Sequence, residues 1–160
     1  MKSLACWLAL SLAVGGSAMA QQHPDLSGYW KLLHADPQAS TNPDSLGVTL
    51  VPDGPFHSLK IVRQFKDHAR TDTFRIGIKS GTVGGTGSSG EVSASWNHET
   101  LRISIENYVT QEAQQLLVSG HEEEWSLDKD GRLLIKMIDR EAGTEPRVVN
   151  LAYERDASTI

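Results

Sequence analysis

Cysteine and basic residues are both scarce in this chain. Among 160 residues there is one cysteine, Cys6, which lies in an N-terminal segment that we expect to be removed. The remaining chain can therefore form no disulfide and carries no thiolate nucleophile or cysteine metal ligand. Lys and Arg number 15 against 20 Asp and Glu, and the basic residues form no cluster. Nucleic acids and anionic membranes are bound through basic patches, so we expect neither as a partner.

Long apolar runs are also absent, except at the N-terminus. Lys2 is followed by the almost wholly apolar stretch Leu4–Val14, and Ala18 and Ala20 place small residues where a signal peptidase cleaves. The glycines and serine at 15–17 end this stretch well short of the roughly 20 apolar residues that span a bilayer. The pattern predicts a signal peptide over residues 1–20.

Export follows from that prediction. We expect residues 21–160 to form a single domain in the periplasm or outside the cell, with no integral membrane segment after cleavage. A domain of this length is large enough to bury an ordinary hydrophobic core without disulfides. The oligomeric state and the choice between periplasm and extracellular space are left open by the sequence.

Apolar and polar residues alternate in short segments separated by turn residues about every ten positions, and helical periodicity is hard to find. This pattern is typical of an all-β protein. We expect strands near 28–34, 46–51, 57–65, 72–79, 92–96, 101–106, 116–127, 132–139 and 148–155. Consecutive hairpins of this kind leave exposed edges unless the sheet closes. The prediction is an antiparallel meander that closes into a barrel of about eight or nine strands.

Several motifs occur along these strands in a fixed order. They are the D-L-S-G-x-W of residues 25–30, a turn at 96–101, W-x-L-x-x-D-G-x-x-L at 125–134 and Y-x-R at 153–155. The G-x-W resembles the first strand of lipocalin-like barrels. The whole series is similar to a group of exported bacterial lipocalin-like proteins that open with D-L-S-G-x-W and are mostly of unassigned function. The T-D-Y signature of the transport lipocalins is absent.

The resemblance implies structural roles at one end of the barrel. Trp30 would plug that end, next to Gly28 on the same strand. An arginine near the last strand would pack over the tryptophan, with Arg155 as the first candidate and Arg147 as the second. An ordinary core tryptophan at position 30 would be buried in the same way.

Gly85, Gly87 and Gly90 match the spacing G-x-G-x-x-G, which in nucleotide-binding folds precedes a helix. Here a strand pattern follows, so we expect no nucleotide cofactor. We interpret residues 80–90 as a glycine-rich loop above the barrel mouth, where it could gate the entry of a ligand.

The segment around residues 117–127 contains the polar and titratable side chains that are the best candidates for a binding site. Strand alternation places Ser119, His121, Glu123 and Trp125 on one face. If that face points inward, these side chains form a polar end of the barrel and could bind a ligand's polar group. Because carboxylates are rarely buried unpaired, the favoured alternative is that residues 122–124 form a solvated acidic run at the rim.

The sequence contains no catalytic motif and no metal-ligand spacing among its six histidines. We therefore name no catalytic residue and no metal ligand, and an enzymatic activity is not favoured. The prediction is a protein that binds a small apolar or amphipathic ligand through Trp30, Ser119, His121, Glu123 and Trp125. One alternative is a structural or interaction protein with a filled barrel. Another is an enzyme that uses the pair His121 and Glu123.

Overall fold

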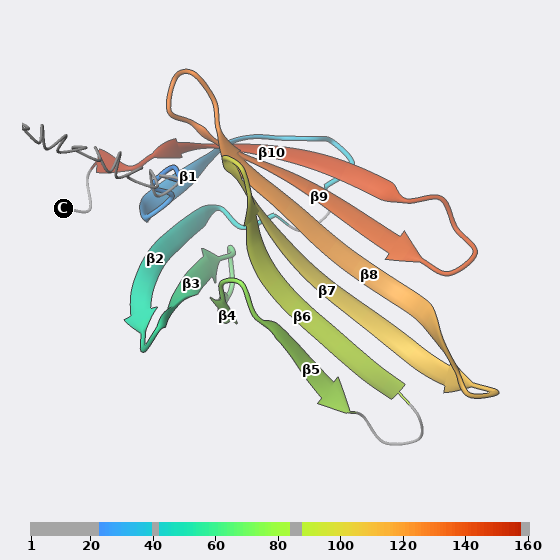
Figure 1. Ribbon diagram of the computed structural model, residues 1–160. Helices are drawn as coiled ribbons and strands as arrows, with labels where there is room; N and C mark the ends of the chain where they lie inside the picture. The colour runs from blue at the N-terminus through green and yellow to red at the C-terminus, as the bar shows by residue number, and fades with distance from the viewer. Residues whose placement is uncertain (1–22, 40–41, 84–87, 158–160) are drawn as a thin grey trace, which may run out of the picture.

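The computed structural model describes residues 23–39, 42–83 and 88–157 (Figure 1). The expected signal peptide, residues 1–20, lies outside these ranges, so export stays a prediction. Within the described ranges, no helix is long and apolar enough to cross a membrane.

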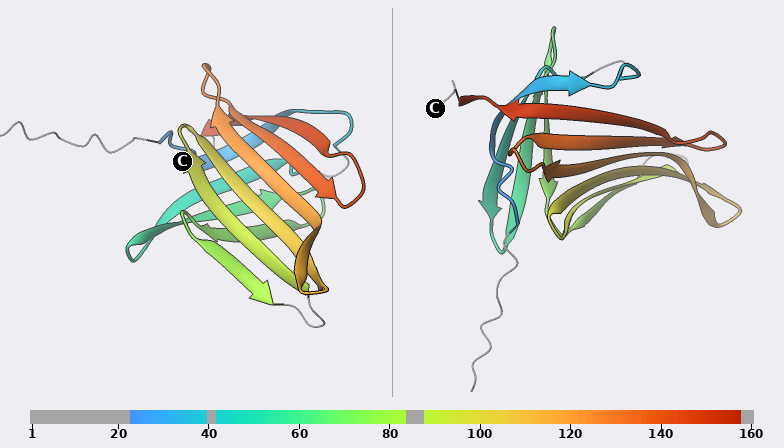
Figure 2. Two further views of the ribbon diagram at one scale, coloured as in Figure 1. Left: turned by 45° about the vertical axis from the view of Figure 1, so that its right-hand side comes forward. Right: turned by 90° about the horizontal axis from the view of Figure 1, so that it is seen from above.

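The described residues form ten antiparallel strands in one sheet. They are β1 (Gly28–Ala35), β2 (Ser45–Asp53), β3 (Phe56–Gln64), β4 (Ala69–Arg75), β5 (Lys79–Val83), β6 (Ser88–Asn97), β7 (Thr100–Gln111), β8 (Gln114–Leu127), β9 (Leu133–Glu141) and β10 (Arg147–Arg155). The strand order is β4-β3-β2-β1-β10-β9-β8-β7-β6-β5, so the first and last strands of the chain are neighbours. Figure 2 shows β2–β4 crossing the direction of β6–β9 at a steep angle. The sheet curls into a nearly closed barrel, which confirms the predicted antiparallel meander. The described parts of the chain contain ten strands, slightly more than the predicted eight or nine.

The barrel is incomplete between β4 and β5, which are the two edges of the sheet. Near this opening the two sides are joined by a bridge between Ile76 and Ala94 and by a hydrogen bond of 2.7 Å from the Gly77 amide to the Ala94 carbonyl. Gly77 has a φ of +81°, a conformation that glycine adopts without strain. The chain therefore leaves one strand and starts another here. The prediction of a single strand over residues 72–79 is wrong. The alternation of apolar and polar residues continues across the break and therefore does not reveal it.

The glycine-rich segment is mostly strand. Its residues pair across a β5–β6 hairpin, with Gly81 opposite Glu91 and Gly90 opposite Thr82. The prediction of a loop over residues 80–90 is therefore wrong. Ladder hydrogen bonds need only backbone groups, so small residues pair where a partner strand is present. The tip at 84–87, with Gly85 and Gly87, lies outside the described residues, and the gating loop stays a prediction.

Inward-facing apolar side chains form one core. Among the residues that the structure describes, sixteen hydrophobic side chains from nine strands and from Leu26 are 7 % exposed or less, and the largest are Trp30, Trp125 and Tyr153. Burial of each large apolar side chain contributes about 1.5–3 kcal/mol. We call the end that carries residues 23–28 the base, and the opposite end, at the turn between β3 and β4, the mouth. At the base, the His23 ring stacks on Trp96 with centroids 4.5 Å apart.

Candidate functional site

A cavity of about 580 Å³ opens at the mouth of the barrel. One wall comes from the end of β3, the following turn and the start of β4, and the other comes from β7, β8 and β9. Its lining residues are Pro43, Arg63, Phe65, His68, Arg70, Ile105, His121, Glu123, Met137 and Asp139. This volume lies within the range of about 300–1,000 Å³ that small-molecule sites occupy. The cavity combines apolar walls with a charged floor.

Glu123 is the centre of the charged floor. Its side chain is 3 % exposed and accepts hydrogen bonds from Arg63 Nη2 at 2.9 Å, from Trp125 Nε1 at 2.8 Å and from His121 Nε2 at 2.9 Å. Burial alone would raise the pKa of this carboxyl group. The bond from His121 and the charge and bond of Arg63 outweigh burial and lower the pKa of Glu123 to about 2. Glu123 is therefore a buried carboxylate at neutral pH.

Arg63 joins Glu123 to the opposite wall. Its Nε donates to Asp72 at 3.0 Å, and its guanidinium carbon lies 5.7 Å from the centre of the Trp125 ring. Arg70 donates to the same Asp72 oxygen, also at 3.0 Å. Burial would lower the pKa of Arg63, but Glu123 and Asp72 raise it. A buried guanidinium thus keeps its charge because carboxylates on both sides compensate for the lost water.

His121 is held between two carboxylates. Nε2 donates to Glu123 at 2.9 Å, and Nδ1 donates to Asp139 on β9 at 2.6 Å. The bond to Glu123, together with Asp139, raises the pKa of His121 against the opposing effect of burial. Carboxylate oxygens only accept hydrogen bonds, so the protonated imidazolium is the form of the ring that satisfies both contacts. We call the chain Asp72–Arg63–Glu123–His121–Asp139 the mouth network.

The acidic run at 122–124 is not solvated, so the favoured alternative is wrong. Glu122 is 8 % and Glu123 is 2 % exposed. Glu122 lies on the outer face and pairs with Arg102 at 3.2 Å and Arg140 at 3.0 Å, while Glu124 pairs with Arg102 at 2.8 Å. Burial is tolerated because each carboxylate has a cationic partner from another strand. The sequence around residues 122–124 itself carries no sign of those partners, because they lie on other strands.

The five predicted ligand-binding residues are only partly brought together. His121 and Glu123 line the mouth cavity, and Trp125 lies directly behind them as a donor to Glu123. Ser119 is placed farther along β8, where its Oγ accepts a bond of 3.0 Å from Asn107. Trp30 does not line this cavity. Whether any of the five binds a ligand stays a prediction.

Trp30 belongs to a second constellation at the base. Its Nε1 donates to the Leu26 carbonyl at 3.0 Å, and the Arg155 guanidinium carbon lies 4.4 Å from the centre of its ring. Arg155 also donates to the carbonyls of Ser27 at 2.7 Å and Asp25 at 3.2 Å. Arg147 lies at the other end of β10. We call Trp30, Arg155 and the carbonyls of residues 25–27 the base clasp.

Gly28 makes room for this clasp. Its φ is +132°, and a Cβ at this position would lie 2.8 Å from Arg155 Nη1. A larger residue would therefore strain the backbone and displace the guanidinium. The position of Gly28 two residues before Trp30 is explained by the approach of Arg155.

Three members of the mouth network were not predicted from the sequence as site residues, namely Arg63, Asp72 and Asp139. One signal was present, because alternation of Leu59 and Ile61 along β3 extends to Arg63. When a charged residue takes the next position on an otherwise apolar, inward-facing side of a strand, its charge is buried and requires a paired group of opposite charge. Within the described parts of the chain, no group of three His, Asp or Glu side chains is arranged to hold a metal ion.

Comparison with known proteins extends the description of the fold. No protein-family model matches the chain, and no curated protein is significantly similar to it. Among solved structures, apo lipid binding protein 8 of Caenorhabditis elegans is similar with a TM-score of 0.53 and 13 % identity, covering 81 % of this chain and 94 % of that chain. A REP1-NXSQ fatty acid transporter gives a TM-score of 0.46 and 14 % identity, with 82 % and 96 % covered. At this identity, the first likeness shows a shared barrel fold. Membership of the D-L-S-G-x-W group stays a prediction.

Proposed function

We propose that the protein is an exported binding protein that holds one small amphipathic ligand at the mouth of its barrel. The observation that carries this proposal is the mouth cavity, in which Phe65, Ile105 and Met137 stand beside the charged floor. The core below the floor is filled by buried side chains. The ligand would therefore lie in the mouth, with its apolar part on those three side chains.

Free donors at the cavity favour a ligand whose polar end accepts hydrogen bonds. Arg63 uses Nε and Nη2 in the bonds described above, and Arg70 uses Nε. Among the described residues, the other guanidinium nitrogens, Arg63 Nη1 and both Nη atoms of Arg70, have no hydrogen-bond partner, so they are donors that a ligand oxygen could meet. The nematode protein with the same fold is described as a lipid-binding protein, which makes lipid-like amphiphiles the first class of probe.

An enzymatic role for His121 is less well supported by the geometry. A general base must accept a proton through a free nitrogen. Both nitrogens of His121 are already engaged by carboxylate oxygens, at 2.6 and 2.9 Å. The pair His121 and Glu123 is therefore better suited to hold charge at the cavity floor than to move protons.

Native mass spectrometry of freshly purified protein, followed by organic extraction, tests the proposal directly. A fluorescent amphiphile such as cis-parinaric acid provides a titratable probe. We expect Met137→Trp to weaken probe binding about tenfold, because the indole fills the cavity. Leu134→Trp, an exposed position on the same strand, is the matched control and should bind as the wild type does.

Two outcomes would contradict the binding proposal. One is a wild-type protein that carries no extractable ligand and does not bind the probe. The other is equal probe affinity in Met137→Trp and Leu134→Trp, since the probe would then lie elsewhere. Absence of binding together with a persistent oligomer would support the alternative of a structural or interaction protein with a filled barrel.

A further inference from the structure

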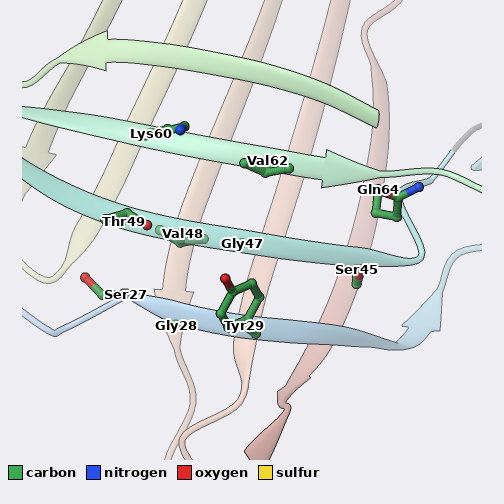
Figure 3. A pocket seen from close by; sticks show the side chains of 10 residues that line it. All are labelled: Ser27, Gly28, Tyr29, Ser45, Gly47, Val48, Thr49, Lys60, Val62 and Gln64. Atoms are coloured by element: carbon green, nitrogen blue, oxygen red, sulfur yellow. The ribbon is translucent and has the colours of Figure 1, made fainter. Parts of the chain in front are cut away.

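The outer face of β1–β3 carries a hollow of about 560 Å³, on the side of the wall away from the core (Figure 3). Its lining residues are Ser27, Gly28, Tyr29, Ser45, Gly47, Val48, Thr49, Lys60, Val62 and Gln64. The register places Tyr29 opposite Gly47 and Gly47 opposite Val62. A glycine inside β2 thus lies between an aromatic and an aliphatic side chain.

The absence of a side chain at Gly47 determines how Tyr29 lies. A Cβ at this position would be 3.3 Å from Tyr29 Cε1 and 3.7 Å from Val62 Cβ. The ring therefore covers the glycine, an arrangement known to support glycine in sheets. Tyr29 is nevertheless 54 % exposed, and Figure 3 shows its ring nearly face-on from outside the barrel. One face of the ring rests on the sheet and the other faces solvent.

The rim of the hollow is polar, and most of its polar side chains have no partner within the described parts of the chain. Among the described residues, the side chains of Ser27, Ser45, Thr49 and Lys60 have no hydrogen-bond or ion-pair partner. Gln64 donates to backbone carbonyls of the β3–β4 turn. The outer face of β7–β9 is different, because several of its charged side chains form ion pairs with one another, namely Arg102, Glu122, Glu124, Lys136 and Arg140. The rim therefore presents hydroxyl and ammonium groups that are available to a ligand.

We propose that this hollow is a saccharide-binding site. One face of a pyranose ring consists of C–H groups, which carry slight positive charge and pack on the negative face of an aromatic ring. Sugar hydroxyls need both donors and acceptors at the edge of that platform, and the hydroxyls of Ser27, Ser45 and Thr49 supply both. The lining contains one ammonium group, on Lys60, and no carboxylate, which suits neutral or acidic sugars.

This inference concerns a different surface from the mouth cavity and does not depend on what the mouth binds. The lining of the hollow shares no residue with that of the mouth cavity. A protein with both sites would hold an amphiphile inside and attach to a glycan outside. Each site can therefore be removed without the other.

Titration of the ¹⁵N-labelled protein with maltohexaose, cellohexaose, N-acetylchitohexaose and hexamannuronate, followed by NMR, tests the proposal. We expect at least one of these sugars to shift the amide signals of Tyr29, Thr49 and Lys60. Tyr29→Leu keeps apolar cover over Gly47 but removes the aromatic face, so the affinity should fall at least about tenfold. Tyr29→Phe should retain binding within about threefold.

Phe56→Leu is the matched control, because Phe56 is an exposed aromatic residue that does not line the hollow. It should leave sugar binding unchanged. The proposal is overturned if none of the four sugars shifts these signals, or if Tyr29→Leu binds as tightly as the wild type. A hexaproline peptide, which also stacks on aromatic rings, serves as a competitor class. Tyr29-dependent binding of that peptide without sugar binding would assign the hollow to a protein partner instead.

Discussion

The two ends of the barrel each contain an arginine near a buried tryptophan, but the arginines are satisfied differently. At the base, Arg155 lies 4.4 Å from the Trp30 ring centre and donates to backbone carbonyls. At the mouth, Arg63 lies 5.7 Å from the Trp125 ring centre and donates to carboxylates. The base clasp therefore uses neutral acceptors, whereas every acceptor in the mouth network ionises.

This difference suggests that the base clasp serves mainly the stability of the barrel, whereas the mouth network serves the candidate binding site. Carbonyl acceptors keep their character at any pH, and the base clasp closes one end of an apolar core. The mouth network concentrates charge beside a cavity, where buried ion pairs contribute little net stability but are costly to disrupt. We expect the base to depend on packing and the mouth to depend on charge compensation.

Replacement of Trp30 should have the largest effect. Trp30→Ala removes a fully buried indole from the core, and such truncations cost about 3–5 kcal/mol in the free energy of unfolding. Urea unfolding followed by circular dichroism measures this change. Leu33→Ala on the same strand, where Leu33 is 50 % exposed, should cost less than about 0.5 kcal/mol. If the two substitutions lowered the free energy of unfolding equally, the conclusion that Trp30 is part of the core at the base would be wrong.

Loss of Glu123 should be the next largest effect. Glu123→Ala leaves the buried Arg63 with one carboxylate fewer and the Trp125 indole nitrogen without its acceptor. We expect the free energy of unfolding to fall by about 3 kcal/mol. The double variant Arg63→Met, Glu123→Leu replaces the ion pair by apolar side chains and should recover about half of this loss or more. A double variant as unstable as Glu123→Ala would show that charge compensation is not the main contribution of the pair.

Arg155→Ala should have a smaller effect. Its guanidinium is exposed and makes a cation–π contact and two bonds to carbonyls, together worth about 1 kcal/mol. Glu154→Ala, the neighbouring exposed position, is the control. We expect the cost of Arg155→Ala to be the same at pH 5 and pH 8. A cost that changes with pH would mean that the base clasp also depends on an ionising group.

The smallest effect should come from titration of His121, because its side chain is 30 % exposed and solvent screens part of its interaction. Its folded pKa is raised above the ordinary value near 6.5. Its contribution is therefore complete below about pH 6.5 and is lost as the pH rises through the folded value. Urea midpoints between pH 5 and pH 9 should decline for the wild type and decline less for His121→Gln. Parallel profiles would contradict this assignment.

At low pH the mouth network weakens because Glu123 gains a proton, whereas at high pH it weakens because His121 loses one. The pKa of Glu123 is lowered to about 2, so its contribution is complete above about pH 4.3 and is lost as the pH falls towards 2. The stabilisation by the mouth network should thus be greatest between about pH 4.3 and pH 6.5.

Most strands and their buried faces were predictable because side chains alternate along a strand with a period of two. Ile103 and Leu101 on β7, and Glu123 and Trp125 on β8, lie on the inner face as alternation requires. The errors fall where local pattern competes with backbone geometry. Gly77 ends one strand inside a clean alternation, and Gly81 and Gly90 pair although glycine is typical of loops.

The sequence by itself determined the class of fold and which side chains could face inward, since both depend on neighbours along one strand. Only the tertiary structure decided which inward residues meet. Glu123 forms a hydrogen bond with Arg63, which is sixty positions away in the sequence. Trp30 contacts Arg155 because the first and last strands pair. These contacts depend on strand order and barrel closure. Those properties arise from hydrogen bonding and packing among all ten strands, so no single segment encodes them.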